Sequence, residues 1–183
     1  MGVRWRWRTS RFERAALPHI AALYRFARQV AGPDAAPDLV QETFLRAWKY
    51  FGSFDPVTNC RAWLFSILRN AWADRWRRQR LEMPLPNEET GIEPYYDWED
   101  EILRNQLPQE IEAALAQLPE EYRWAVLLAD VEELSYQEIT HVMRCPIGTV
   151  MSRINRGRRM LARSLRTYHE QRVMRQQQTG KSR

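Results

Sequence analysis

Apolar residues recur at helical spacing along most of the chain, and this pattern predicts a series of helices separated by proline and glycine breaks. The predicted helices cover about residues 13–30, 36–51, 60–80, 109–117 and 120–130, followed by a helix-turn-helix from Leu134 to Arg159. Residues 1–11 have no clear period and are predicted to form a ragged arm, and the polar tail is predicted to fray after Met174. Because β-branched alternation is nearly absent, the predicted fold class is all-α.

Charge divides the chain into modules. Basic residues concentrate in 61–80 and 144–183, whereas residues 81–104 hold eight carboxylates against Arg104 alone. That acidic stretch also contains prolines and a glycine, which is typical of a linker, so the sequence predicts two small helical modules joined by an acidic linker. Two basic blocks around an acidic one favour two contacts with nucleic acid. The predicted boundaries are an N-terminal arm 1–11, a first module 12–80, a linker 81–108, a second module 109–166 and a polar tail 167–183.

The predicted helix-turn-helix carries the most specific signals. Ser135 and Glu138 have the spacing of a capping box, and Pro146 suits the first residue of the second helix, where a backbone N–H is not needed. The residues of the second helix predicted to face inward are Ile147, Val150, Ile154 and Leu161. Its outward face, rich in arginine with serine and asparagine, suits reading of the DNA major groove, although a solvated basic face would give the same pattern. The candidate DNA-reading residues are Thr149, Met151, Ser152, Arg153, Asn155, Arg156 and Arg159.

The first module has two candidate contact surfaces. One is an outward helix face that suits protein docking, or is merely solvated, formed by Asp38, Gln41, Glu42 and Leu45. The other is the end of the helix predicted over 60–80, where tryptophans alternate with arginines, a composition that suits single-stranded DNA. Trp63 and Trp72 are predicted to be core residues, whereas Trp76 is left open. Asn70 is either a hydrogen-bonding partner for a flipped base or a partner for neighbouring backbone.

Several functional classes find no support in the sequence. No apolar run approaches the length of a membrane span, and no signal-peptide pattern opens the chain, so we expect a cytoplasmic protein without membrane insertion. Cys60 and Cys145 have no metal-ligand spacing, and the linker acids are interpreted as a solvated charge run. There is no pairing of a nucleophile with a base and no phosphate-cradling glycine loop. We therefore expect no enzyme activity, no cofactor and no metal.

With both modules considered, the chain resembles the extracytoplasmic-function (ECF, group IV) sigma factors of bacterial RNA polymerase. DLVQETFLRAWKYFGSFDP followed by RAWLFSILRNAWADRWRR is similar to sigma region 2, and LPEEYRWAVLLADVEELSYQEITHVM followed by PIGTVMSRINRGRRML is similar to sigma region 4. The resemblance implies a promoter-specificity factor that binds core RNA polymerase through the clamp helices of the β′ subunit and the flap of the β subunit. The Asp38, Gln41, Glu42 and Leu45 face would then dock on polymerase, and the helix-turn-helix residues would read the −35 element. The residues implied for the melted −10 element are Phe54, Asp55, Asn59, Arg69, Asn70 and Arg77.

The resemblance also bears on regulation. Parts of both modules are similar to stress-responsive members that are restrained by zinc-containing, redox-responsive anti-sigma factors, although Glu132-Glu133 stands where such proteins often carry Glu-Gly. The main alternative is a stand-alone helix-turn-helix transcriptional regulator, which would bind duplex DNA without polymerase. A serine recombinase with a C-terminal helix-turn-helix would need an α/β catalytic domain, and the strand signals for one are missing.

Overall fold

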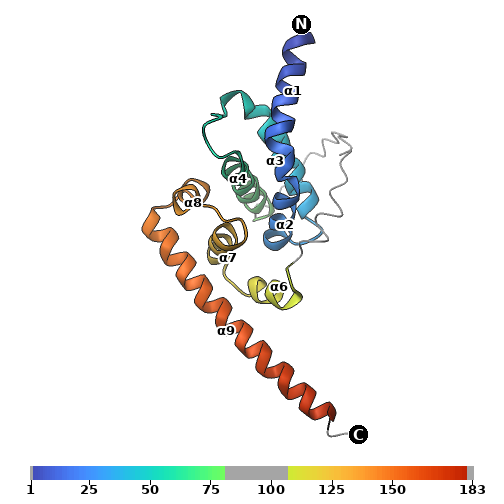
Figure 1. Cartoon of the computed structure of the whole chain (residues 1–183), viewed down its shortest axis with the longest axis vertical. Coiled ribbons are helices and arrows are strands. Elements are labelled where there is room, and N and C mark those ends of the chain that lie inside the picture. Colours follow the sequence, from blue (N-terminus) through green and yellow to red (C-terminus); the bar gives the residue numbers. More distant parts are fainter. Residues whose placement is uncertain (1, 81–106, 181–183) are drawn as a thin grey trace. The chain divides into compact units, whose positions relative to one another are not determined.

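A computed structural model describes residues 2–80 and 107–180, and the acidic linker lies almost wholly outside these ranges. The chain divides into two compact units, residues 1–106 and 107–183, which correspond to the two predicted modules and are called here the N-terminal and C-terminal modules. Both are built from helices, and the described residues contain no strand (Figure 1). The prediction of an all-α fold is confirmed. No helix within the described ranges combines the length and the apolar character needed to cross a membrane.

Within residues 2–80, the N-terminal module has four α-helices packed together and two short 3₁₀ turns. Two predicted helices, over 36–51 and 60–80, agree with α3 and α4 to within one residue. The elements are α1 (Gly2–Ala16), η1 (Leu17–His19), α2 (Ile20–Ala31), α3 (Ala36–Tyr50), η2 (Phe51–Ser53) and α4 (Cys60–Arg80).

The predictions for the first 30 residues were wrong in two respects. The ragged arm is instead the helix α1, and the helix predicted over 13–30 is interrupted at Leu17–His19. Pro18 explains the interruption, because proline cannot donate a backbone hydrogen bond within a helix. Tertiary contacts explain α1: the ring of Phe12 lies edge-on to Trp48 and to Phe51, with ring centroids 5.2 Å away in each case. The spacing of apolar residues within 1–11 cannot reveal contacts with residues so far along the chain.

The core of the N-terminal module lies between α2, α3 and α4. Phe26 of α2 packs against Phe65 of α4 with ring centroids 4.9 Å apart, among fully buried leucines from all three helices. Trp72 is buried, as predicted. Trp63 is only half-buried, because it covers the loop before α4 rather than entering the core, and Trp76 is exposed.

The C-terminal module surrounds one fully buried tryptophan, Trp124, with Leu115, Ile139 and Ile154 among the other fully buried side chains. Its elements are α6 (Gln109–Ala116), α7 (Glu120–Val126), the π-helical turn η3 (Leu127–Val131), α8 (Tyr136–Met143) and α9 (Ile147–Gly180). The predicted fraying after Met174 was wrong, since α9 continues to Gly180. The residues after Met174 are mostly arginine and glutamine, which favour helix, and they extend a helix that is already nucleated.

The predicted helix-turn-helix is present as α8, a turn and α9. Ser135 and Glu138 make the reciprocal capping box, and Arg144 ends α8 in the left-handed conformation. Pro146 lies one residue before α9 rather than at its first position, and its carbonyl accepts hydrogen bonds from the N–H groups of the first turn. Ile147 is exposed, contrary to the prediction, although Val150, in the same first turn of α9, is fully buried.

The loop between η3 and α8 contains a residue in the left-handed backbone conformation. Glu133 has φ of +51°, in the left-handed region that favours glycine, while the side chain of Glu132 is buried. The position where related sequences were expected to carry glycine is therefore one where glycine would relieve backbone strain.

Candidate nucleic-acid interface

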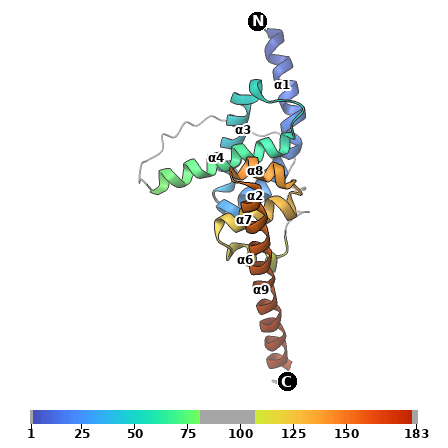
Figure 2. The ribbon, with the colours of Figure 1, turned by 90° about the vertical axis from the view of Figure 1, so that its left-hand side faces the viewer.

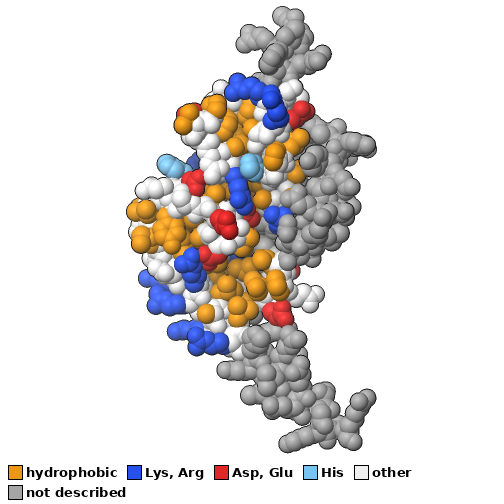
Figure 3. All heavy atoms as spheres, viewed as in Figure 1, with side chains coloured by type: hydrophobic (Ala, Val, Ile, Leu, Met, Phe, Trp, Pro, Cys, Tyr) orange, Lys and Arg blue, Asp and Glu red, His pale blue; other side chains and the backbone are white. Residues whose placement is uncertain are grey.

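The exposed face of α9 gathers most of the predicted DNA-reading residues. Val150 and Ile154 are buried against the module, so the opposite side of the helix faces solvent. The predicted residues exposed on that side are Met151, Ser152, Asn155, Arg156 and Arg159, while Thr149 is half-buried. Figure 3 shows Lys and Arg side chains along the outer edge of α9. The exposed residues, called here the reading face, are Met151, Ser152, Asn155, Arg156 and Arg159. Their side chains include the donors and acceptors that base edges and phosphates require.

Two arginines flank the buried side of α9, and each forms an ion pair with a carboxylate of the same module. Arg153 Nη2 lies 3.1 Å from Glu121 Oε2 on α7, and its Nη1 donates to Cys145 Sγ at 3.6 Å. Arg158 makes a two-pronged pair with Asp130 on η3, in which Nε donates to Oδ2 at 3.0 Å. The structure thus places Arg153, a predicted reader, at the edge of the reading face in an ion pair.

The remaining arginines of the reading face have different surroundings. Among the residues that the structure describes, neither Arg156 nor Arg159 pairs with a carboxylate. Arg159 makes only a long hydrogen bond from Nε to the carbonyl of Asn155, at 3.4 Å. The two side chains are therefore accessible to phosphates or base edges without first breaking an ion pair.

Gly157 sets how closely α9 approaches α7. A Cβ atom at this position would lie 2.5 Å from Val126 Cγ2 and 3.2 Å from the carbonyl oxygen of Tyr122. Any larger residue would push the two helices apart. The absent side chain therefore fixes the position of the reading face relative to the rest of the module.

The loop between α3 and α4 contains three of the residues predicted for the −10 element, and its conformation depends on all three. Phe54 stacks on Phe51 with ring centroids 5.7 Å apart and contacts Trp63 at 4.8 Å. Asp55 Oδ1 accepts a hydrogen bond from the N–H of residue 57 at 3.0 Å, which forms an Asx-type turn. Asn59 Oδ1 accepts one from the N–H of residue 61 and so caps α4.

The other predicted −10 residues are spread along α4. Arg69 and Asn70 are half-buried in the middle of the helix, whereas Arg77 is exposed near its end. At ~1.5 Å per residue, Asn59 and Arg77 are roughly 27 Å apart along the helix axis. The structure therefore does not bring all six into a single pocket, but it does arrange them along one loop and one helix.

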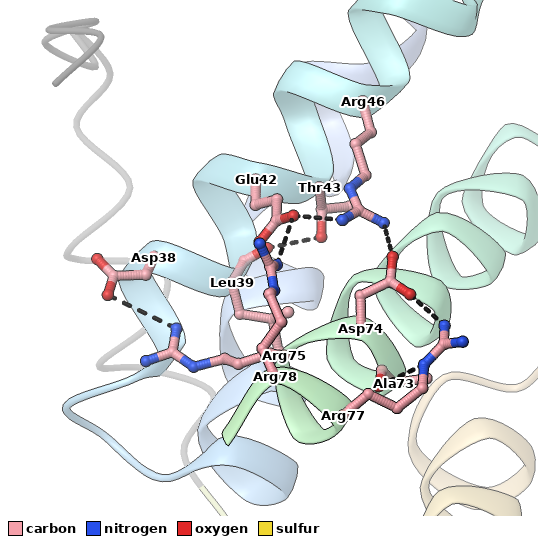
Figure 4. Close-up of polar contacts among 10 residues, drawn as sticks. All are labelled: Asp38, Leu39, Glu42, Thr43, Arg46, Ala73, Asp74, Arg75, Arg77 and Arg78. Carbon is pink, nitrogen blue, oxygen red and sulfur yellow. Dashed lines mark hydrogen bonds and ion pairs between the residues drawn. The ribbon is translucent and has the colours of Figure 1, made fainter. Parts of the chain in front are cut away.

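The face predicted to dock on polymerase overlaps with a network of ion pairs between α3 and α4 (Figure 4). Glu42 pairs with Arg46 on its own helix and with Arg78 of α4 at 3.4 Å. Asp38 Oδ2 lies 3.6 Å from Arg75 Nη1. Asp38 and Glu42 thus take part in ion pairs within the module. Gln41 is exposed, and Leu45 is half-buried at the surface.

Asp74 is the central carboxylate of the same network. It accepts a hydrogen bond from Arg46 Nη1 at 2.7 Å and another from Arg77, one turn further along α4. Burial raises the pKa of Asp74, but the hydrogen bonds and charges of Arg46 and Arg77 outweigh burial and lower the pKa below its ordinary value. The carboxylate is therefore ionised at neutral pH and fixes the direction of both arginines.

Sequence reasoning missed the residues that hold these faces in place. The local pairs had a signal, since Glu42–Arg46 and Asp74–Arg77 are spaced four and three residues apart on their helices. The long-range pairs had none, because nothing in the sequence places Asp130 beside Arg158. Cys60, at the start of α4, is half-buried, and this burial raises the pKa of its thiol to about 11.

Both modules match known families of domain. A family model described as Sigma-70 region 2 matches residues 17–82, and one described as Sigma-70, region 4 matches residues 108–161. The matches include α4 with its preceding loop and the helix-turn-helix with its reading face. They leave out α1.

Similar proteins and structures share these two regions. The chain is 36% identical over 157 residues to the ECF RNA polymerase sigma factor EcfG of Rhodopseudomonas palustris (strain TIE-1), covering 81% of this chain and 80% of EcfG. It is 38% identical over 147 residues to the ECF RNA polymerase sigma factor SigE of Mycolicibacterium smegmatis, covering 78% of this chain and 57% of SigE. A solved structure of the sigma factor RpoE in complex with the anti-sigma factor NepR, from Bartonella quintana, matches with a TM-score of 0.69 at 30% identity, covering 85% of this chain and 96% of that one.

Proposed function

The chain belongs to the ECF family of RNA polymerase sigma factors, and on this premise we propose that it directs core RNA polymerase to promoters with specific −35 and −10 elements. The observation that carries the proposal is the reading face of α9. It displays arginine, asparagine and serine on a helix whose opposite side is fixed to its module by Val150, Ile154 and Gly157. Such a helix can enter the major groove as a rigid body.

The N-terminal module supplies the second contact in this proposal. Single-stranded −10 DNA would follow the loop of Phe54, Asp55 and Asn59 and continue along α4 past Arg69, Asn70 and Arg77. The support is chemical: aromatic rings stack on unpaired bases, and arginines bind phosphates. Melting would follow from tighter binding to the open strand than to the duplex, which must offset the few kcal/mol of unstacking a base. No chemical step by this chain is required, so we propose a transcription initiation factor rather than an enzyme.

Binding to the polymerase clamp is assigned to the outward side of α3. Asp38 and Gln41 are exposed and Leu45 is half-buried, while Asp38 and Glu42 also pair with arginines of α4. Docking that uses Glu42 would therefore require it to exchange an intramolecular partner for one on polymerase. The flap of the β subunit is the partner expected for the C-terminal module.

Restraint by an anti-sigma factor completes the proposal. RpoE, the structurally similar protein, was solved with the anti-sigma factor NepR bound, which supports the same mode of regulation for this chain in the cytoplasm, where polymerase acts. A stress-responsive role fits this regulation. A zinc-containing, redox-responsive partner stays a prediction from the sequence resemblance.

The test is run-off transcription with purified core RNA polymerase, with and without this chain, on a library of promoter fragments. We expect transcripts only in its presence, from templates that share a −35 and a −10 element. Tight, specific binding of the free chain to duplex DNA with no polymerase-dependent transcript would contradict the proposal. That outcome would establish the stand-alone regulator instead.

A further inference from the structure

The helix α1 lies outside the region-2 match, which begins at residue 17. Figures 1 and 2 both show its first turns extending beyond α2, α3 and α4. The sequence of α1 holds five arginines against the single acid Glu13. A basic helix that projects from a DNA-binding module is a surface without an assigned partner.

The C-terminal half of α1 is fixed by one face. Phe12 is buried, with its ring against Phe44, Trp48 and Phe51. Ala16, one turn further along, is fully buried. This face therefore determines which side of α1 points to solvent.

The opposite face is basic. Arg11 and Arg14 are exposed, and Arg14 Nε donates a hydrogen bond to the carbonyl of Ser10 at 3.2 Å. Arg11 and Arg14, called here the arginine row, lie about one helical turn apart. Glu13 falls on another side of the helix.

The anchoring rings also connect α1 to the loop assigned to the −10 element. Phe12 contacts Phe51, and Phe51 stacks on Phe54 of that loop. The distance from Arg11 to the loop is thus set by two successive ring contacts rather than by a flexible tether. DNA held at the loop would pass beside the arginine row.

From this charge and placement, we propose that the arginine row of α1, Arg11 and Arg14, binds the phosphate backbone of promoter DNA next to the −10 element. The proposal rests on the proposed function for its partner. The contact adds affinity but no base specificity, because arginine side chains on phosphates read charge rather than sequence.

The test uses the full chain assembled with core polymerase and a promoter fragment recovered by run-off transcription. Binding is measured between 50 and 200 mM salt for the wild type and for the double variant Arg11→Gln/Arg14→Gln. Each lost phosphate contact lowers the slope of log affinity against log salt by about 0.9. We expect the slope to fall by about 2, so that the loss of affinity over this salt range is roughly tenfold smaller than for the wild type.

Two matched variants separate the row from general charge effects. Arg11→Lys/Arg14→Lys keeps both cations and should keep the slope. Glu13→Gln changes the charge on another face of the same helix and should leave the slope unchanged. An unaltered slope for Arg11→Gln/Arg14→Gln would overturn the proposal. So would weaker binding to core polymerase with an unaltered slope, because the row would then contact protein.

The two proposals can fail separately. If wild-type holoenzyme yields no specific transcript, the proposed function has failed, and the row is tested on the free full chain with a 30-base-pair duplex of mixed sequence. The same fall in slope supports the phosphate contact there, and an unchanged slope rejects it.

Discussion

The two modules prepare their predicted contact surfaces in opposite ways. In the C-terminal module, carboxylates hold the arginines at the two edges of α9 and leave Arg156 and Arg159 accessible between them. In the N-terminal module, two carboxylates of the predicted surface itself, Asp38 and Glu42, pair with arginines. If both predicted surfaces bind as proposed, the first needs no ion pair broken at Arg156 and Arg159, whereas the second would exchange ion pairs when its partner binds.

This difference has an energetic consequence. An ion pair at the edge of a binding face reduces the number of side-chain conformers that binding has to freeze, so it favours affinity. An ion pair inside the face must be broken, and the desolvated partners must find equivalent ones. We therefore expect substitutions in the C-terminal module to separate cleanly into structural and DNA-binding effects, and substitutions in the N-terminal module to mix the two.

The largest expected effect tests whether the close approach of α9 to α7 at Gly157 stabilises the C-terminal module. Gly157→Val should lower the free energy of unfolding of the C-terminal module by about 3 kcal/mol, because its Cβ would clash with Val126 and with the backbone of Tyr122. The matched control is Gly148→Val in the same helix, where the added Cβ meets open space and the change should stay within about 0.5 kcal/mol. Urea unfolding, with hydrogen exchange of α7 and α9, measures both. Equal stability of the two variants would show that the close approach is not needed.

The next effect separates two arginines three residues apart on α9. Arg156→Ala should weaken promoter binding by about 1–3 kcal/mol without altering the unfolding midpoint, because the side chain is exposed and makes no ion pair with a described residue. Arg153→Ala should lower the free energy of unfolding by up to about 1 kcal/mol through loss of the Glu121 pair. Fluorescence anisotropy and urea unfolding of the same two variants provide the comparison. If Arg153→Ala weakens promoter binding and Arg156→Ala lowers the free energy of unfolding instead, Arg153 rather than Arg156 would be the residue that contacts DNA.

A smaller effect is expected for the central carboxylate of the N-terminal module. Asp74→Asn should lower the free energy of unfolding by about 1 kcal/mol at pH 7, since the pairs with Arg46 and Arg77 are partly screened by solvent. The pKa of Asp74 is depressed in the folded protein, so its contribution is present above its ordinary value near 3.8 and is lost as pH falls through the lower folded pKa. The wild type and Asp74→Asn should therefore converge in acid. Glu13→Gln, at an exposed carboxylate, is the control, and a difference that persists in acid would contradict the assignment.

The smallest effect concerns the loop before α8. Glu133→Gly should raise the free energy of unfolding by about 0.5 kcal/mol, because relief of the left-handed conformation exceeds the added freedom of the unfolded chain. Glu132→Gly, at the neighbouring position with a buried side chain, should destabilise instead. Thermal unfolding of both variants measures the sign. A loss of stability in both would mean that the Glu133 side chain contributes more than its backbone costs.

Local signals explain which parts of the fold could be predicted. The capping box of Ser135 and Glu138 and the apolar spacing of α3 and α4 act within a few residues, and those elements were found within one or two residues of their ends. The helix α1 was missed because Phe12 is stabilised by rings 36 and 39 residues away. The break at Pro18 was missed because the apolar spacing continues across it.

The candidate sites were predictable as faces but not as individual roles. Periodicity correctly placed Asn155 and Arg156 on the exposed side of α9. It could not distinguish Arg156 from Arg153, because the difference lies in Glu121, which is 32 residues away. It likewise could not reveal that Asp55 and Asn59 build the loop whose DNA contacts they were predicted to make.

The burial of Phe12 has a practical meaning for dividing this protein into parts. A fragment cut at residue 17, where the region-2 match begins, would keep every matched position but lose Phe12. The rings of Phe44, Trp48 and Phe51 would lose a shared neighbour, and a new aromatic patch of this kind promotes aggregation. The smallest stable N-terminal piece therefore begins at or before residue 12. At this end of the chain, the unit that folds is longer than the unit that homology defines.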